Sequence, residues 1–397
     1  MLTSDQKIKI NEKVQGFKEA ADFYRMEYSQ DLMGMFREFG CMLLEACGIN
    51  AEDDLEIKQL FGYRQVLRGT VKRQLTVIAE ELAGLWKAPV SGEMFQAALS
   101  GIFDFCLYSR GGKNRYLLPV EIAKPLLGLV TCPEGMLSPG EGETVLDTQC
   151  GAGSTLMTAC KYLKNPKLMG YELDEELWAA GIIISRLSEL KMELHLQEEV
   201  PACLYESCDL VISNPVYGTD TIKDDSLAEE LPSELRTVRG RYHLELIRGM
   251  LALKYDGRAM LIVPNSFLFA NRTESIKVRK WLLQSYSLEA VIALPEDTFL
   301  YSGVRSSVMI FSKPFMSSGW EGHTQRVLYY SLEKQEDKEK QKQEYERLEE
   351  VWSQRDSYYG KWERCRREKT VENRNGIKVP ENWQYNSFWF SGAAGIE

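Results

Sequence analysis

Three residues that directly follow an apolar run could bind and activate an aromatic amino group. The run CDLVIS (208–213) leads into Asn214, Pro215 and Tyr217, within the stretch SNPVYG. The amino nitrogen of a heterocyclic base is a poor nucleophile because its lone pair is delocalised into the ring. The Asn214 side-chain oxygen and the Pro215 carbonyl oxygen can each accept a hydrogen bond from such a group, and Tyr217 offers a flat face for stacking. The stretch predicts a catalytic site for group transfer to that nitrogen, through positioning and electrostatics.

A glycine-containing turn earlier in the chain, LDTQCGAGST (146–155), could bind a nucleoside cofactor. Gly151 and Gly153 remove side chains where the backbone must approach a ligand closely, and a helix expected from Ser154 would direct its first N–H groups at that ligand. Asp147 ends the strand before the turn, where open parallel sheets bind ligands, and Glu172, at the end of the next strand, can accept hydrogen bonds from ribose hydroxyls. We assign seven residues to the cofactor: Asp147, Cys150, Gly151, Ala152, Gly153, Ser154 and Glu172.

Each motif alone also has a simpler interpretation. Asn-Pro often makes a turn after a strand, and a glycine turn can do no more than join a strand to a helix. The order of the motifs and the acid at Glu172 favour a cofactor site followed by a catalytic site. A dinucleotide site would require the full GxGxxG pattern and a phosphate-binding loop would end in Gly-Lys-Ser/Thr, whereas this chain has CGAGST.

The elements that must position these residues alternate along the middle of the chain. Residues 1 to 110 carry helical spacing, with Gly48 as a plausible helix end. Strands then alternate with helices, which predicts an α/β fold with a mostly parallel sheet covered on both faces. The last two strands are joined by the short segment PEDTFLYSGVRS, which indicates an antiparallel pair at one edge. The expected strands are 144–147, 168–172, 192–196, 208–213, 258–263, 289–294 and 307–312.

The C-terminal part, from residue 318, changes to a charge-rich helical pattern. Five large side chains follow a repeat of 3.5 residues, and this pattern fits either a helix packed on its own domain or a coiled-coil arm that binds a partner subunit. The five are Tyr345, Leu348, Trp352, Tyr359 and Trp362. We therefore expect three parts: a helical domain (1–110), a cofactor-binding domain (111–317) and a charged helical extension (318–397).

Composition limits the possible functions. The net charge of −10 argues against a protein that binds nucleic acid through its overall charge, because phosphates are neutralised by Lys and Arg. Nine scattered cysteines without a CxxC pair and only three histidines make a metal site unexpected, and reduced thiols predict a cytoplasmic location. No apolar run approaches the roughly 18 residues of a membrane span, and no signal peptide is expected from the start of the sequence.

These motifs resemble those of DNA adenine-N6 methyltransferases, in particular the modification subunits of type I restriction-modification systems. The family pattern Asp-Pro-x-Cys-Gly-Ser-Gly corresponds to Asp147–Gly153, its acidic residue after the second strand to Glu172, and Asn-Pro-Pro-Tyr/Phe to Asn214–Tyr217. The resemblance covers residues 110 to 316. It implies a seven-stranded methyltransferase sheet with a reversed strand, S-adenosyl-L-methionine as the cofactor, and methyl transfer to N6 of an adenine flipped out of double-stranded DNA.

The resemblance also implies partners. The chain leaves little room for a domain that reads the DNA sequence, so a separate specificity subunit is expected to do so, and a restriction subunit can complete such systems. Residues 219–241 are candidates to close over the DNA, with Arg236, Arg239 and Arg241 at phosphates, although a solvated charged loop fits them equally well.

Three departures from the family pattern weaken the cofactor assignment more than the reaction type. Val216 replaces the second proline, and Leu118 stands where the family has Thr-Pro before the glycine motif. The family's acid after the third strand is absent, and Glu198 or Glu199 could replace it. Two other functions therefore stay open: methylation of an RNA adenine or a protein glutamine, and a subunit of the same fold that has lost catalysis and serves as a scaffold or a DNA-binding component.

Overall fold

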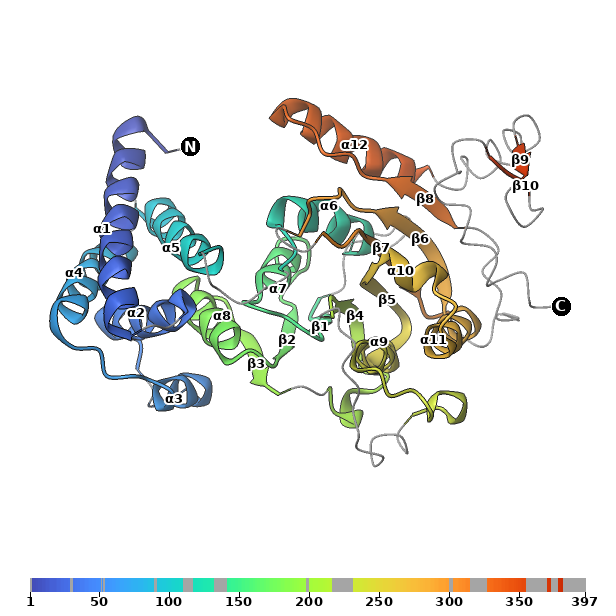
Figure 1. The fold of residues 1–397 in the computed structure, drawn as a ribbon, viewed down its shortest axis with the longest axis horizontal. Coiled ribbons are helices and arrows are strands. Elements are labelled where there is room, and N and C mark those ends of the chain that lie inside the picture. The colour runs from blue at the N-terminus through green and yellow to red at the C-terminus, as the bar shows by residue number, and fades with distance from the viewer. Residues whose placement is uncertain are drawn as a thin grey trace. The chain divides into compact units, whose positions relative to one another are not determined.

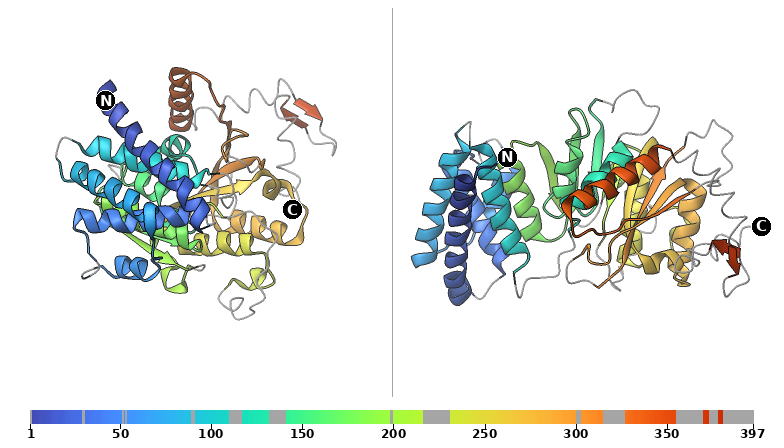
Figure 2. Two further views of the ribbon diagram at one scale, coloured as in Figure 1. Left: turned by 60° about the vertical axis from the view of Figure 1, so that its left-hand side comes forward. Right: turned by 90° about the horizontal axis from the view of Figure 1, so that it is seen from above.

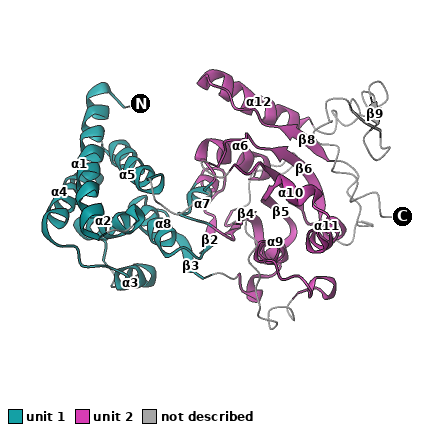
Figure 3. Cartoon of the chain, in the orientation of Figure 1, with its two compact units in different colours: residues 1–117, 150–157, 169–198 teal, residues 118–149, 158–168, 199–397 magenta. Residues whose placement is uncertain are grey.

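The computed structural model describes most of the chain in two compact units. The described residues are 2–28, 31–50, 52, 54–88, 91–109, 117–131, 141–197, 200–215, 231–299, 303–314, 327–354, 370–372 and 378–380. One unit contains residues 1–117, 150–157 and 169–198, and the other contains 118–149, 158–168 and 199–397 (Figure 3). Because the units interleave along the chain, the domain boundaries expected at residues 110 and 317 stay predictions.

The first unit is mainly helical, as the spacing of apolar residues predicts. Its central helix, α2, is buried along both faces and contacts four other helices, α1, α4, α5 and α8. The helices of this unit are α1 (Ser4–Tyr28), α2 (Leu32–Cys47), α3 (Leu55–Gly62), α4 (Gly69–Trp86), α5 (Gly92–Leu107) and α8 (Glu175–Leu187), with the start of α7 (Ser154–Ala159).

Local sequence signals set the limits of α2. Asp31 caps its first turn by accepting a hydrogen bond from the Met33 N–H, and Gly48 ends it with φ +83°, as expected from the sequence. At Gly40 the helix approaches α8 so closely that a Cβ would lie 2.3 Å from Cδ1 of Ile183. The helical part of the chain and the helix that follows β2 therefore share one core.

Eight strands form a sheet in the order β3-β2-β1-β4-β5-β7-β6-β8, which confirms the α/β class (Figure 1). The pairs β1–β4, β4–β5 and β6–β8 are parallel, and β7 runs antiparallel to both β5 and β6. The strands are β1 (Thr144–Asp147), β2 (Lys167–Glu172), β3 (Met192–Leu196), β4 (Cys208–Ser213), β5 (Leu253–Pro264), β6 (Ser287–Ala293), β7 (Ser306–Ser312) and β8 (Leu328–Ser331).

Two expectations for the sheet need correction. The sheet has eight strands rather than seven, because β8 adds to β6 with Ala290 opposite Leu328. The antiparallel pair β6–β7 exists, but it does not form the edge, because β8 lies outside β6. The short, tyrosine-rich β8 lacks a long apolar run, which explains why the sequence pattern did not reveal it. A separate antiparallel pair joins β9 (Thr370–Glu372) to β10 (Lys378–Pro380).

Helices cover both faces of the sheet in the second unit. α6 (Val120–Thr131) and α12 (Lys338–Ser353) lie on one side, and α9 (Arg241–Ala252) and α11 (Thr273–Ser285) lie on the other (Figures 1 and 2). The short helices η1 (Ala202–Leu204), η3 (Ser233–Leu235) and α10 (Asn265–Phe269) complete this unit.

The charged helix α12 packs on α6 of its own unit, which favours the first of the two interpretations of this segment. Leu348 and Trp352 are buried, 0% and 3% exposed. Tyr359 and Trp362, the rest of the predicted repeat, lie outside the described residues. Within the described part of the chain, no helix is long and apolar enough to cross a membrane, and no three His, Cys, Asp or Glu side chains are grouped as metal ligands.

Candidate active site

The candidate residues of the second unit lie at the carboxyl ends of two paired strands. β1 pairs in parallel with β4, with Asp147 opposite Ile212, and the Thr148 N–H donates to the Ile212 carbonyl (3.0 Å). Parallel strands end at the same edge, so Asp147 and the residues after Ser213 are neighbours. Asp147 is 2% exposed, and its Oδ1 accepts a hydrogen bond from the Gln149 N–H (3.2 Å). The sheet therefore brings these parts of both motifs together.

Three polar side chains that the sequence analysis did not single out connect these strand ends. Thr148 Oγ1 lies 2.7 Å from Ser213 Oγ and 2.8 Å from Gln149 Oε1, and Ser213 Oγ lies 3.4 Å from the same Gln149 oxygen. Thr148 and Ser213 are 1% and 0% exposed. Opposite them, a Cβ on Gly249 of α9 would lie 3.0 Å from Thr148 Cγ2. The cluster fixes the start of the Asn-Pro turn relative to β1, and only the strand pairing could have identified it.

The Asn-Pro turn itself follows β4 directly, as predicted. Asn214 is partly exposed and Pro215 is buried. Tyr217 and Val216 lie outside the described residues, as do Glu198 and Glu199. Leu118, which stands in place of the family's Thr-Pro, is buried, 3% exposed. The second unit therefore presents a partly exposed amide beside a buried carboxylate, at one edge of the sheet.

In the first unit, the glycine turn adopts the backbone conformation that its glycines predict. Gly151 and Gly153 have φ values of +56° and +75°, which side-chain-bearing residues rarely adopt. The Cys150 N–H donates to the Tyr171 carbonyl (2.9 Å), and the Gly153 N–H donates to the Cys150 carbonyl (2.8 Å). α7 begins at Ser154 directly after the turn, so the predicted turn-to-helix transition is confirmed.

Glu172 joins the glycine turn to the start of α8. Its Oε2 accepts from the Gly151 N–H (2.8 Å), and its Oε1 accepts from the N–H groups of Leu173 (2.8 Å) and Asp174 (2.7 Å). Burial raises the pKa of Glu172 above its ordinary value, although the three backbone hydrogen bonds oppose the shift. A carboxylate has about four acceptor positions, so among the described residues one position on Oε2 is left for a ligand.

Strand β3 supports this turn from behind. A Cβ on Gly153 would lie 2.8 Å from Met192 Cε, and a Cβ on Gly170 of β2 would lie 2.8 Å from Leu194 Cδ2. On α8, a Cβ on Gly181 would lie 2.7 Å from Leu194 Cδ1. The absence of a Cβ at these three positions lets the turn, β2 and α8 pack closely on β3, and at Gly153 glycine also suits the positive φ.

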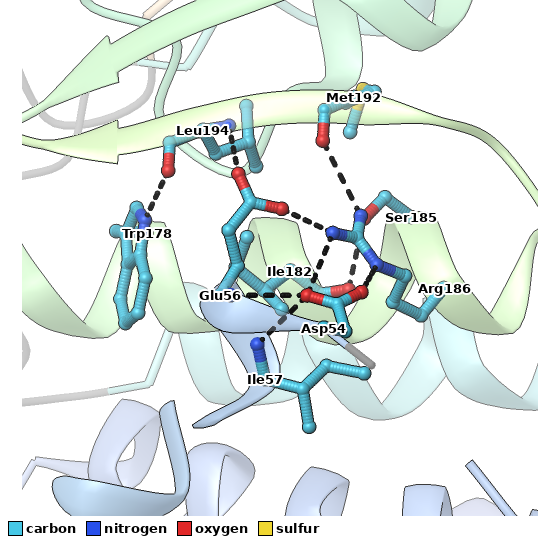
Figure 4. A network of polar contacts seen from close by, with 9 residues as sticks. All are labelled: Asp54, Glu56, Ile57, Trp178, Ile182, Ser185, Arg186, Met192 and Leu194. Atoms are coloured by element: carbon cyan, nitrogen blue, oxygen red, sulfur yellow. Dashed lines mark hydrogen bonds and ion pairs between the residues drawn. The ribbon is translucent and has the colours of Figure 1, made fainter. Parts of the chain in front are cut away.

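A network of ion pairs ties β3 and α8 to α3 (Figure 4). Arg186 of α8 donates to both carboxylate oxygens of Asp54, at 2.6 and 3.3 Å, and also pairs with Glu56. Glu56 Oε1 accepts from the Leu194 N–H (2.6 Å), while the Trp178 indole N–H donates to the Leu194 carbonyl (2.9 Å). Both outward backbone groups of Leu194 are thus satisfied by side chains, which closes part of the edge of the sheet.

Comparison with known proteins shows the family of the chain. The family model described as N-6 DNA Methylase matches residues 104–373, more than half of the chain. The chain belongs to the N-6 DNA methylase family. One relative is the methylase subunit of the type I restriction enzyme EcoEI from Escherichia coli, which is 24% identical over 284 residues, covering 65% of this chain and 54% of that subunit.

Two solved structures share the fold. The modification subunit of a candidate type I restriction enzyme from Vibrio vulnificus YJ016 superposes with a TM-score of 0.65 at 15% identity, covering 97% of this chain and 98% of that one. The methyltransferase subunit of a type I restriction-modification system from Streptococcus thermophilus gives 0.62 at 17% identity, with 87% and 93% covered. The chain spans about half the length of the curated relatives it matches. The family and the fold are those that the sequence motifs indicated.

Proposed function

We propose that this chain transfers a methyl group from S-adenosyl-L-methionine to N6 of an adenine in double-stranded DNA. The observation that carries the proposal is the position of Asn214 and Pro215, directly after β4 and beside the carboxyl end of β1. Asp147, the last residue of β1, and the glycine turn at 151–153 belong to one short segment of the chain. A cofactor bound at Asp147 would be next to the Asn-Pro turn.

The residues of the glycine turn fit such a cofactor. Gly151 and Gly153 are buried and have no Cβ, so a ligand could approach their backbone closely once the Leu117 side chain beside Gly151 moves. The remaining acceptor position of Glu172 can take a ribose hydroxyl. When bound, S-adenosyl-L-methionine would supply an electrophilic methyl group on a sulfonium: the S–CH3 bond would break as the N–CH3 bond forms, S-adenosylhomocysteine would leave, and the methylated nitrogen would release one proton to solvent. The Cys150, Ala152 and Ser154 assignments rest on the same turn and stay part of the proposal.

Two neutral acceptors perform the catalytic work in this proposal. The Asn214 side-chain oxygen and the Pro215 carbonyl oxygen accept the two hydrogens of the adenine amino group, which favours a pyramidal nitrogen with an available lone pair. Tyr217 stacks on the ring of a base flipped out of the duplex, and such stacking contributes about 1–3 kcal/mol. That gain offsets an unstacking cost of about a few kcal/mol.

We also propose that a specificity subunit reads the DNA sequence. The described helices and strands build the two compact units, and we assign none of their residues to reading bases. A net charge of −10 leaves the chain without a general attraction to DNA, so a second subunit would add the base contacts. A restriction subunit would complete such an assembly.

The proposal is tested with a cofactor that carries a labelled methyl group. The purified chain, with and without its specificity subunit, is incubated separately with duplex DNA, RNA and protein, and incorporated label is counted. We expect label in DNA, and its loss in Asn214→Ala. Asn11→Ala, an exposed change on α1, serves as the matched control and keeps wild-type transfer.

Two other results would identify the alternatives. Label in RNA or in protein glutamine, and none in DNA, would show that the chain performs the same chemistry on another substrate. A folded chain that binds no S-adenosyl-L-methionine in calorimetry and labels nothing would be a non-catalytic subunit, and either result rejects the proposal.

A further inference from the structure

A basic surface lies on the second unit, although the chain as a whole is acidic. Residues 236–241 and 271–280 together carry seven Lys and Arg and a single acid, Glu274, in a chain of net charge −10. The seven are Arg236, Arg239, Arg241, Arg272, Lys277, Arg279 and Lys280. Such a local excess of one charge attracts partners of the opposite charge.

Direct contacts join the two segments into one surface. Glu274 Oε1 accepts from the Arg239 N–H (2.9 Å), and its Oε2 accepts from the Gly240 N–H (3.1 Å). Lys277 Nζ donates to Thr237 Oγ1 (2.6 Å). The carboxylate of Glu274 is therefore used to anchor the backbone that leads into α9.

The surroundings of His243 show the same positive field. Its Nε2 lies 2.9 Å from Ser275 Oγ, and its Nδ1 lies 3.7 Å from Glu274. Burial lowers the pKa of His243; Glu274 opposes the shift, whereas Arg272 and Arg279 lower the pKa further. Both arginines are thus close enough to act on α9 from the start of α11 and its first turns.

Five of the basic residues differ in their contacts and exposure. Arg239 donates to the carbonyls of Arg236 (2.6 Å) and Val238 (3.0 Å), and Arg279 donates to the Ala270 carbonyl (2.9 Å) and to that of Phe267, so these two hold the loops. Arg236 also donates to a carbonyl, that of Leu231 (3.3 Å), but it is exposed, as are Arg272 and Lys280. Arg272 and Lys280 can therefore contact a partner without disturbing the fold.

The chain topology places this surface at the same edge of the sheet as Asn214. α9 follows β4 and leads into the parallel strand β5, so α9 begins at the edge where β4 ends. β5 and β6 both run antiparallel to β7, so α11, which connects them, also begins at that edge. The two basic segments are the starts of these two helices.

We propose that Arg236, Arg272, Lys277 and Lys280 contact the phosphates of the DNA duplex that presents the target adenine. This inference rests on the proposed function and adds the surface that holds the substrate. DNA is the partner that fits, because it carries one negative charge per about 1.7 Å of helix axis. An acidic protein surface would be attracted by the same charges and is an outcome of the test.

The test compares two double variants that remove the same charge. Arg272→Gln/Lys280→Gln alters the basic surface, whereas Lys338→Gln/Lys340→Gln alters equally exposed side chains on α12. Duplex binding by the full chain is measured by fluorescence anisotropy from about 50 to 200 mM salt, and each phosphate contact contributes about 0.9 to the slope of log K against log salt.

We expect the slope of the Arg272/Lys280 variant to be shallower by about 1.8, with about 60-fold weaker binding at about 0.1 M salt. The α12 variant should keep the wild-type slope. Calorimetry with S-adenosyl-L-methionine should give wild-type affinity for both variants, which shows that they are folded.

Two results would overturn the inference: equal slopes for both variants, or no duplex binding by the wild-type chain at low salt. Equal slopes together with methyl transfer to DNA would reject the surface and leave the proposed function intact. If the Arg272/Lys280 variant loses binding to an acidic protein but keeps duplex binding, the surface would be assigned to that protein instead. A shallower slope without methyl transfer would support the surface and reject the proposed reaction.

Discussion

Replacing Arg186 with methionine should destabilise the unit that carries the glycine turn. The change keeps an apolar stem of similar length but removes the charge that Asp54 and Glu56 share. Two neighbouring carboxylates are then left without their cation, and one of them, Glu56, also accepts the hydrogen bond from the Leu194 N–H of β3. The stability of β3, and through it the packing of Met192 against the turn, should therefore decrease.

The partial exposure of the network determines how much stability Arg186→Met should lose. Breaking a fully buried ion pair costs about 3–5 kcal/mol, and a hydrogen bond to a charged group contributes about 1.5–3 kcal/mol. The side chains of Arg186, Asp54 and Glu56 are 16%, 25% and 22% exposed, so water can replace part of what is lost. We expect a loss of about 2–3 kcal/mol, between the buried and the surface cases.

Hydrogen–deuterium exchange read by mass spectrometry measures this loss locally. Peptides that contain α3, α8 and β3 should exchange faster by the factor that corresponds to that free energy. Arg25→Met is the matched control, because Arg25 is 40% exposed and pairs with Asp22 of the same helix; it should cost about 0–1 kcal/mol.

The effect should also depend on pH. Burial alone would raise the pKa of Asp54, but Arg186 and the N–H groups at the start of α3 outweigh it and hold the pKa below its usual value. A carboxylate with a lowered pKa stabilises the fold above its unfolded pKa, and this contribution is lost as pH falls through the folded value. In Arg186→Met the pKa of Asp54 should lie closer to its usual value, so this variant should lose less stability than the wild type as pH falls. Equal exchange in Arg186→Met and Arg25→Met would refute the reasoning.

Three further predictions concern the turn and the tail. Gly170→Ala should cost about 1–3 kcal/mol in thermal unfolding, because its Cβ would lie 2.7 Å from Cys150 Sγ; unchanged stability would contradict this packing. Glu172→Gln should weaken cofactor binding by at least about tenfold. Burial raises the pKa of the wild-type carboxyl, so cofactor binding by the wild type should decline at acid pH, whereas binding by the variant should not; calorimetry at two pH values tests both. Leu348→Ala should lower the free energy that protects α12 from hydrogen exchange by about 2–5 kcal/mol, because Leu348 is buried; if α12 were a free partner-binding arm, the change would have no effect.

The strands and the two motifs could be predicted from the sequence because their signals are local. Apolar runs such as 208–213 end at polar or glycine-containing turns, and Gly48 ends its helix through its own φ value. The α/β class, the reversed strand and the turn-to-helix transition at Ser154 follow from such local signals. Both the family and the fold are therefore recognisable from the sequence.

The rest depends on contacts between residues far apart in the sequence. The Thr148–Ser213 hydroxyl pair exists only because β1 and β4 pair in one register, and Asp54 meets Arg186 across 132 positions of sequence. Neither carries a sequence signature of its own. The eighth strand was missed because Leu328–Ser331 is short and is held mainly by its pairing with β6.

The central claim is that Asn214 activates an adenine amino group, and the identity of the methylated nucleoside tests it most directly. Duplex DNA treated with the chain, its specificity subunit and S-adenosyl-L-methionine is digested and analysed by mass spectrometry, in parallel with Asn214→Ala. We expect N6-methyldeoxyadenosine with the wild-type chain and none with Asn214→Ala, while calorimetry shows retained cofactor binding. Methylation of a different base, or undiminished N6-methyldeoxyadenosine with Asn214→Ala, would contradict it.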